Sequence, residues 1–178
     1  MRARLLAATL LATGLSSSAF GPAFGAETAP PPPGCASPEH HQFDFWIGEW
    51  NVSDTKTGQA GGASIIESLY GGCGIRENWS DPQITGGSLN IYDNADHRWH
   101  QFWIDSSGAR REFIGGLDDS GKMVLVAHVP SVLHPELIIQ VRMILTANPD
   151  GSVEQVSDMS RDNGVTWVPR YDYTYRKK

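Results

Sequence analysis

Two carboxylates inside runs of β-forming residues have the greatest capacity for chemistry in this sequence. Glu77 lies in the run Ile75–Trp79, and Glu112 lies in the run Arg111–Ile114. A pair of carboxylates can divide the roles of general acid and general base, as in an isomerase, a cyclase or a hydrolase. A surface position or a structural network is the more common use of such residues, so we assign no catalytic residue.

Polar and aromatic side chains share faces of several predicted strands. Residues two apart in a strand point to the same side, which groups Glu77 with Trp79 and Gln101 with Trp103. If these faces point inward, they form a polar cavity with aromatic walls, suited to a small, partly apolar molecule. A filled polar network and a solvent-facing surface are the alternatives. The candidate cavity residues are Glu77, Trp79, Asn90, Gln101, Trp103, Glu112 and Gln155.

Other kinds of site have less support. His97 and His100 are three residues apart, so on a strand they point to opposite sides and are poorly placed to share a metal. No serine or cysteine lies in a nucleophile motif such as G-x-S-x-G, and there is no phosphate-binding glycine loop. We therefore expect no metal and no cofactor.

The elements that position these residues are short strands between turn motifs. Segments such as Asp93–Asp96, Asp118–Gly121 and Asn148–Gly151 separate runs rich in β-formers. The pattern predicts an all-β fold, an antiparallel meander of about eight to ten strands. Large residues on both faces of 98–105 favour closure into a barrel, with a β-sandwich as the alternative. The predicted strands are 46–53, 63–70, 74–80, 87–93, 98–105, 110–117, 122–129, 137–146, 152–160 and 166–176.

The first 25 residues are typical of a secretory signal peptide. Met1–Arg4 is basic, and Leu5–Leu15 is apolar and uncharged. Residues 26–34 are rich in alanine and proline and predict a flexible tether, so one folded domain is expected over 35–178. We expect an exported protein, periplasmic or extracellular, with no transmembrane segment.

Net charge limits the class of partner. The formal charge is −6, and removal of the predicted signal peptide takes away two arginines and no acid, which leaves −8. An acidic protein lacks the basic face that nucleic acid or an anionic membrane requires. We therefore expect a small-molecule partner and no nucleic acid.

Two cysteines, Cys35 and Cys73, are present. An even number in an exported protein predicts one disulfide, which stabilises a domain by about 2–4 kcal/mol. A redox pair or a pair of metal thiolates is the alternative, but the sequence contains no C-x-x-C motif.

The segment Ser160–Trp167 matches the pattern S-x-D-x-G-x-T-W. It resembles the Asp-box hairpins that are repeated in sialidase propellers. One copy in a chain of this length is too little for a propeller, so we interpret it as a structural hairpin. The aspartate then accepts backbone N–H groups, the glycine takes a positive φ, and the tryptophan covers the turn.

Both ends of the predicted domain resemble those of calycins, the superfamily of lipocalins and fatty-acid-binding proteins. Gly48-x-Trp50 lies at the first strand, and Tyr171–Arg176 lies close to the C-terminus. The resemblance implies that Trp50 closes one end of the barrel and that an arginine stacks on it. Arg176 is the expected arginine, with Arg142 as its rival. Haem-binding barrels resembling nitrobindin use a late histidine, which here leaves His128 or His134.

A second resemblance extends over most of the chain. Its motifs are His41–Trp50, Gly72–Cys73 with Glu77–Trp79, Ser88–Asp93, Arg98–Asp105 and the hairpin Ser160–Trp167. Together they resemble an uncharacterised family of exported bacterial proteins with a calycin-like barrel. The resemblance implies the fold and no activity. Our leading hypothesis is a non-enzymatic binder of a small molecule. A small enzyme with an interior carboxylate and a structural envelope protein with a filled barrel are the alternatives.

Overall fold

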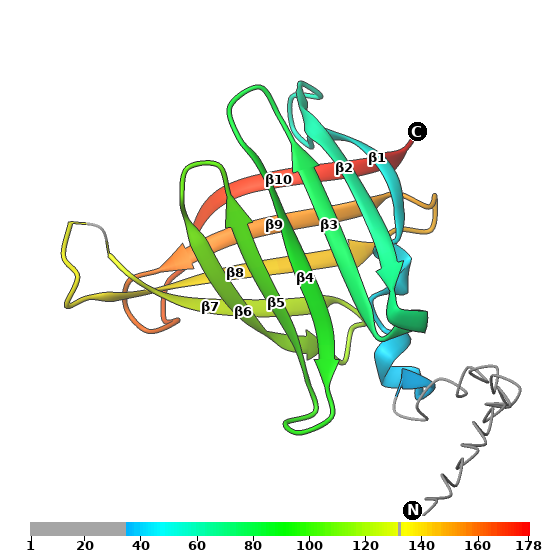
Figure 1. The fold of residues 1–178 in the computed structure, drawn as a ribbon. Helices are drawn as coiled ribbons and strands as arrows, with labels where there is room; N and C mark the ends of the chain where they lie inside the picture. The colour runs from blue at the N-terminus through cyan, green and yellow to red at the C-terminus, as the bar shows by residue number, and fades with distance from the viewer. Residues whose placement is uncertain (1–34, 132) are drawn as a thin grey trace, which may run out of the picture. The chain divides into compact units, whose positions relative to one another are not determined.

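The computed structural model describes residues 35–131 and 133–178, which form ten antiparallel strands. Each strand pairs with the next, and β1 pairs with β10, so the sheet closes into a barrel (Figure 1). The predicted meander and its closure are confirmed, and the sandwich alternative is wrong. The predicted signal peptide, 1–25, and tether, 26–34, lie outside the described residues. The strands are β1 Gly48–Asp54, β2 Ala60–Leu69, β3 Gly74–Ser80, β4 Thr85–Asp93, β5 Arg98–Asp105, β6 Arg110–Leu117, β7 Met123–Pro130, β8 Ile138–Ala147, β9 Val153–Ser160 and β10 Val168–Lys177.

Aspartates begin many of the turns between strands. The carboxylate of Asp54 accepts the N–H groups of Lys56 and Thr57, and that of Asp118 accepts those of Ser120 and Lys122. These hydrogen bonds satisfy backbone N–H groups that have no partner in the sheet where the chain reverses. They also hold the pKa of both aspartates below the usual range. The turn residues that separate the strands in sequence therefore also fix the hairpins.

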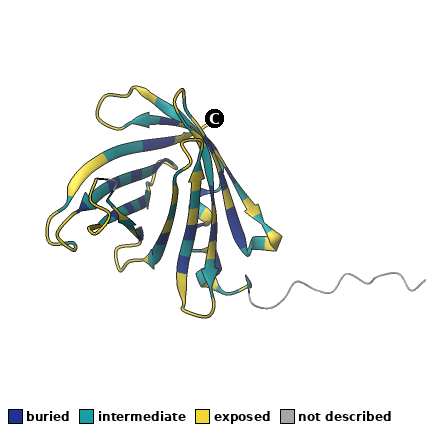
Figure 2. Cartoon of the chain, turned by 60° about the vertical axis from the view of Figure 1, so that its left-hand side comes forward, coloured by how far each residue is buried: buried dark blue, intermediate teal, exposed yellow. Residues whose placement is uncertain are grey.

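Inward and outward side chains alternate along the strands, and Figure 2 shows the resulting bands of buried and exposed residues. The barrel interior is apolar at one end, where Met123, Leu125 and Leu145 are fully buried. Two short 3₁₀ turns, η2 (Pro38–His41) and η3 (Asp44–Trp46), lie at this end, in blue in Figure 1. We call it the closed end.

Aromatic side chains fill the closed end. Phe43 stacks on Trp46 with ring centroids 5.0 Å apart, and Trp99 meets Phe43 edge-on at 5.5 Å. Trp50 is fully buried and donates its indole N–H to the Trp46 carbonyl at 2.9 Å. The predicted strand 46–53 therefore starts late, at Gly48, because Trp46 belongs to η3 and packs as a plug.

The cation on the Trp50 ring is not the one that the resemblance implied. Lys177 Nζ lies 5.1 Å from the Trp50 ring centroid, since Lys177 is the register partner of Trp50. Arg176 points outward and is exposed. The rival Arg142 stacks on Trp167 at 4.0 Å and pairs with Asp158 at 2.6 Å. Both arginine assignments are therefore corrected to Lys177.

A disulfide joins Cys35 to Cys73, as predicted. Cys35 lies just before η2, and Cys73 lies just before β3. The bond therefore ties the segment that forms the closed end to the wall of the barrel.

The hairpin Ser160–Trp167 has the structural role predicted for it. The carboxylate of Asp162 accepts the Thr166 N–H at 2.8 Å, and Gly164 has a φ of 87°. Trp167 donates its indole N–H to the Gly164 carbonyl at 3.0 Å. The motif closes the turn between β9 and β10.

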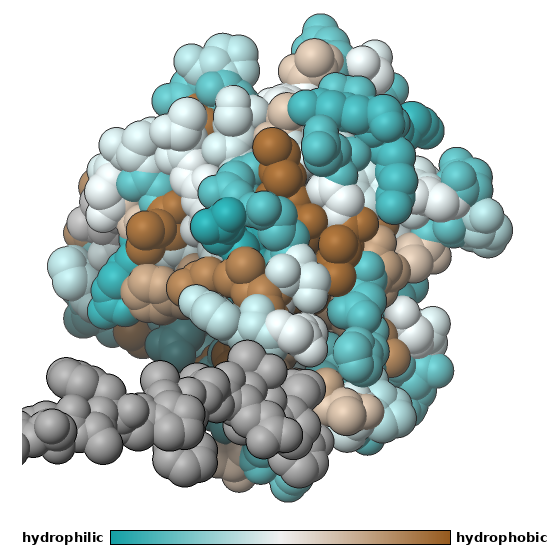
Figure 3. Space-filling model, turned by 45° about the vertical axis from the view of Figure 1, so that its right-hand side comes forward, coloured by the Kyte–Doolittle hydropathy of each residue, from teal (hydrophilic) through white to brown (hydrophobic). Residues whose placement is uncertain are grey.

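The outer surface carries apolar side chains among hydrophilic ones, as the face in Figure 3 shows. Leu89, Ile91, Phe102 and Ile104 are the exposed apolar residues of β4 and β5. None of the helices in 35–131 and 133–178 has the length and hydropathy needed to cross a membrane.

Candidate functional site

A cavity of about 260 Å³ lies inside the barrel, opposite the closed end. Its rim includes the β3–β4 loop at Asp81 and Ile84 and the β5–β6 turn at Ser107. Aromatic, charged and amide side chains line it, and we call it the barrel cavity. Its size is at the lower limit of sites for drug-sized molecules, so it suits a small ligand.

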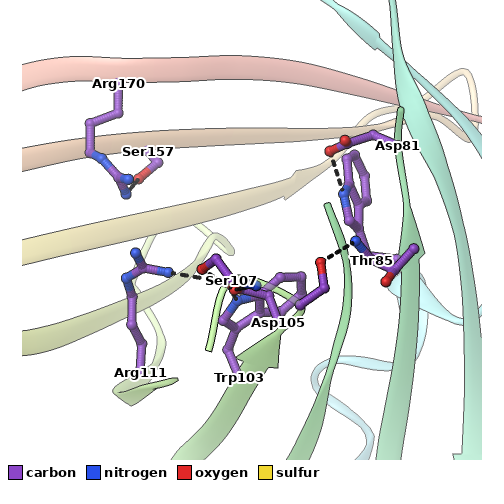
Figure 4. A network of polar contacts seen from close by, with 10 residues as sticks. Asp81, Thr85, Trp103, Asp105, Ser107, Arg111, Ser157 and Arg170 are labelled. Carbon is purple, nitrogen blue, oxygen red and sulfur yellow. Dashed lines mark hydrogen bonds and ion pairs between the residues drawn. The ribbon is translucent and has the colours of Figure 1, made fainter. Parts of the chain in front are cut away.

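Two tryptophans stand in equivalent positions on its wall. Trp79 Nε1 donates to Asp81 Oδ2 at 2.9 Å, and Trp103 Nε1 donates to Asp105 Oδ2 at the same distance (Figure 4). Each aspartate follows its tryptophan by two residues: Asp105 is the last residue of β5, and Asp81 is the first residue after β3. Each aspartate therefore lies on the same side of the chain as its tryptophan. The repeated W-x-D arrangement fixes the orientation of both indoles.

Glycines behind the indoles let them lie flat on the neighbouring strand. A Cβ on Gly62 would lie 2.7 Å from Trp79 Cζ2, and a Cβ on Gly86 would lie 2.8 Å from Trp103 Cζ2. No other residue fits at either position without displacing the ring or the backbone. The indoles are therefore held from behind by glycine and from the side by aspartate.

Tyrosines of β10 extend this aromatic wall. Tyr173 stacks on Trp79 with centroids 6.0 Å apart and planes 19° apart, and Tyr171 stacks on Tyr173 at 4.8 Å and 18°. The three nearly parallel rings form a fixed stack along one wall, the type of surface that flat apolar groups bind.

Glu77 is the acidic group deepest in the barrel cavity, with an exposed fraction of 5%. Ser88 Oγ donates to its Oε2 at 3.0 Å, and Ser64 Oγ donates to its Oε1 at 3.3 Å. Asn90 in turn donates to Ser88 Oγ at 3.0 Å and accepts from Gln101 Nε2 at 2.8 Å. The hydrogen bonds therefore run from Gln101 through two side chains and end on the carboxyl group.

Burial raises the pKa of Glu77 to about 7, although the hydrogen bonds from Ser88 and Ser64 act in the opposite direction. No arginine or lysine of the described residues forms an ion pair with this carboxyl group. The group can therefore gain and lose a proton near neutral pH, which is the property of a general acid or base.

Neutral hydroxyls lie near Glu77. Tyr175 donates to Gln155 Oε1, and Gln155 Nε2 donates to Tyr171 OH at 3.4 Å. Burial raises the pKa of Tyr171 to about 12 and that of Tyr175 well above its usual value, so both remain protonated. They supply polar contacts without adding charge to the cavity.

The structure brings most of the predicted cavity residues together. Glu77, Trp79, Gln101, Trp103 and Gln155 all line the barrel cavity. Asn90 is buried outside the cavity lining, where it accepts a hydrogen bond from Gln101 and donates one to Ser88.

Glu112 is the predicted residue that the structure places elsewhere. It points outward from β6 and is half exposed, and its Oε1 lies 3.9 Å from His100 Nδ1. Phe113 occupies the inward position beside it. Pairing Glu112 with Glu77 as acid and base is therefore wrong.

Other residues of the cavity were missed from the sequence. Asp81 and Asp105 are recognisable afterwards from the W-x-D repeat, and Phe113 from its place in β6. In β10 the residue that alternation could not find is Arg170, because a register shift between Pro169 and Tyr171 lets two consecutive residues, Arg170 and Tyr171, line the cavity. The missed residues of the cavity are Asp81, Ile84, Asp105, Ser107, Arg111, Phe113, Met143, Arg170, Tyr171, Tyr173 and Tyr175.

One group of possible metal donors occurs in the described residues, at Asp93, Asp96 and His100. It lies on the β4–β5 hairpin, at the other end of these strands from the barrel cavity. Asp93 already accepts the Ala95 N–H, and Asp96 pairs with His100 at 2.9 Å. These are contacts of a turn, and they support no metal centre.

Comparison with protein-family models and with curated proteins finds no match. Membership of the exported family suggested by the sequence motifs therefore stays a prediction.

Proposed function

We propose that this protein is an exported, calycin-like barrel that binds a small, partly apolar molecule in the barrel cavity. The observation that carries the proposal is the pair of indoles, each fixed by a glycine and an aspartate, on the wall of a cavity that holds a buried carboxyl group. The disulfide supports export, because such bonds persist in oxidising compartments.

The geometry favours a ligand over a filled interior. At the closed end, aromatic rings pack on one another and leave no exposed surface, as for Phe43, Trp46 and Trp99. At the other end, Trp103 and Tyr173 remain only partly buried although their neighbours hold them rigidly. Rigid apolar surface beside a few polar groups is the usual composition of a ligand site.

Native mass spectrometry of the mature protein, purified gently from periplasm, tests the proposal. We expect a bound small molecule that is retained by the wild type and lost from Trp103→Ala. The matched control is Trp167→Ala, which removes a tryptophan from the outer hairpin and leaves the barrel cavity intact. A ligand-free wild type that also fails to bind small aromatic compounds in titration contradicts the proposal.

Proton transfer by Glu77 is the second candidate function. It is favoured by the pKa of about 7 of a carboxyl group that lines the cavity. Glu77 would remove a proton from a bound molecule and return it at another position, as in an isomerase.

Isotope exchange separates this chemistry from simple binding. The co-purified molecule is incubated with protein in deuterated water and its mass is followed. Incorporation of deuterium with wild type but not with Glu77→Gln supports proton transfer. Binding without any exchange leaves the protein a binder and rejects the enzyme.

A further inference from the structure

We propose that the ligand of the barrel cavity carries an oxyanion, a carboxylate or a phosphate, that binds between Arg111 and Arg170. This inference rests on the proposed function and names the class of molecule bound. Arg111 extends from β6 and Arg170 from β10, and in Figure 4 the two guanidinium groups point toward one another across the cavity.

The two aspartates at the rim of the cavity, Asp81 and Asp105, already accept several internal donors. Asp81 accepts the Trp79 indole and the N–H groups of Gln83 and Ile84 at 2.7–2.9 Å. A carboxylate has about four acceptor positions, so three of the four are in use.

Most acceptor positions of Asp105 are in use in the same way. It accepts the Trp103 indole together with the backbone N–H and the hydroxyl of Ser107. Partial burial raises the pKa of both aspartates, but the donors outweigh it and hold each pKa below the usual range. The two carboxylates therefore act as supports for the indoles, and a cationic ligand finds few free acceptors.

The arginines, in contrast, have most of their donors unused. A guanidinium carries five N–H donors. Arg170 makes one long hydrogen bond, from Nη1 to Ser157 Oγ at 3.5 Å, and lies within 4 Å of no carboxylate in the described residues. Arg111 makes one loose ion pair, with Nη1 3.9 Å from Asp105 Oδ2.

Both guanidinium groups reach the cavity even though their side chains begin at its rim. The Arg170 side chain is exposed, but its partner Ser157 is 1% exposed, so the tip of Arg170 reaches a buried position. Arg111 has an exposed fraction of 31% and lies beside a nearly buried Asp105. Paired N–H donors in a planar fork match the two oxygens of a carboxylate or phosphate.

Aromatic surface adjoins the arginines, which defines the rest of the ligand. The Arg170 Cζ lies 5.9 Å from the Tyr171 ring centroid. Asp105 accepts the Trp103 indole N–H and also pairs with Arg111, so Trp103 and Arg111 share this neighbour. A molecule that binds here has an anionic head at the rim and a flat apolar body inside.

Calorimetric titration with three probes of one shape tests the inference: 2-naphthoate, neutral 2-naphthamide and cationic 2-naphthylmethylammonium. We expect naphthoate to bind at least about tenfold more tightly than the other two, because charge-assisted hydrogen bonds contribute more than neutral ones. Arg111→Gln and Arg170→Gln should each weaken naphthoate binding by about five- to tenfold and leave naphthamide within about twofold.

Matched controls come from the same strands. Arg110→Gln and Arg176→Gln remove outward, exposed arginines from β6 and β10, and both should bind naphthoate like the wild type. Equal affinity for all three probes, or naphthoate binding that is insensitive to Arg111 and Arg170, overturns the inference and leaves the binding function standing. Absence of binding by every probe overturns the inference, and together with a ligand-free wild type in native mass spectrometry it overturns the binding function as well.

Discussion

At the scale of single residues, Glu77 combines two features that rarely occur together. Its carboxyl group is removed from water and has no ion pair with a lysine or arginine within residues 35–131 and 133–178, and it ends a chain of hydrogen bonds that begins at Gln101. Desolvation favours the protonated form, whereas the serine donors favour the ionised one. Desolvation outweighs the serine donors and raises the pKa from 4.5 to about 7, so the charge of the cavity changes within the physiological range.

Stability should fall with rising pH because of this one residue. The folded protein holds the Glu77 proton more tightly than the unfolded chain, so the stabilisation is complete below pH 4.5 and is lost as the pH rises to about 7. A pKa rise from 4.5 to about 7 corresponds to about 3 kcal/mol of unfolding free energy. Glu77→Gln should therefore gain about this much relative to the wild type between pH 4.5 and 8 in urea melts.

The matched control for this experiment is Glu112→Gln, since Glu112 is half exposed on the outer face. It should follow the pH dependence of the wild type. A difference in unfolding free energy between wild type and Glu77→Gln that stays constant with pH contradicts the raised pKa of Glu77.

Glu112 also shows why the site could be predicted only in part. Period-two alternation identifies residues that share a face, which correctly grouped Glu77 with Trp79 and Gln101 with Trp103. Alternation alone does not say which face is the interior. In β6 the inner face carries Arg111 and Phe113, so Glu112 points outward.

At the scale of elements, the path of β4 determines how the cavity is lined. Gly86 in β4 is the register partner of both Trp79 in β3 and Asp105 in β5. At this position no side chain of β4 lies between the two neighbouring strands. The Trp103 ring occupies the space that a side chain at Gly86 would fill. Because Gly86 has no side chain, the Trp103 indole can lie flat against the backbone of β4.

Gly86→Ala should disturb both the ring and the strand. The new Cβ would lie 2.7 Å from the Ile104 carbonyl oxygen and 2.8 Å from Trp103. We expect a loss of about 1–3 kcal/mol of unfolding free energy in denaturant melts and weaker ligand binding. Gly116→Ala in β6, where nothing lies within 4 Å, is the control and should change stability by less than about 0.5 kcal/mol. Equal effects of both substitutions contradict the proposed contact.

The first strand and the 3₁₀ turn before it act as one closing element. Trp50 is fully buried and donates its indole N–H to the Trp46 carbonyl. Trp50→Ala should therefore cost about 3–5 kcal/mol in a urea melt. Trp167→Ala, which removes a partly exposed ring, should cost clearly less. A loss below about 1 kcal/mol for Trp50→Ala rules out its role in the core.

Strands were more predictable than the segments between them. The turn motifs place most strands within one or two residues of their observed bounds, because hairpins between adjacent strands need only local sequence information. The largest error is the start of β2, predicted at 63 and observed at Ala60. The start of β1 was placed two residues early, because an aromatic-rich run there forms η3 and plugs the barrel. Whether such a run becomes a strand or a plug depends on contacts with distant residues, such as that between Phe43 and Trp99.

At the scale of the whole molecule, the disulfide joins the closed end to the barrel wall across a sequence separation of 38. Closing a loop of this length stabilises the folded state by up to about 4 kcal/mol on the chain-entropy estimate. The double variant Cys35→Ser/Cys73→Ser should lose about 2–4 kcal/mol in denaturant melts. Dithiothreitol should lower the stability of the wild type to that of the variant and leave the variant unchanged. An unchanged midpoint after complete reduction contradicts this contribution.

Pairing of β1 with β10 also sets the order in which the chain can fold. β1 can pair with β2 as soon as β2 has been made. Its other edge stays unpaired until β10, the last strand, has been made. Contacts this far apart in sequence form slowly, and an unpaired edge invites association with other chains in the meantime. The cysteines are much nearer to each other in sequence, so their bond can form while the last strands are still missing. An early covalent link of this kind holds the plug against β3 and leaves the final strand to close the barrel.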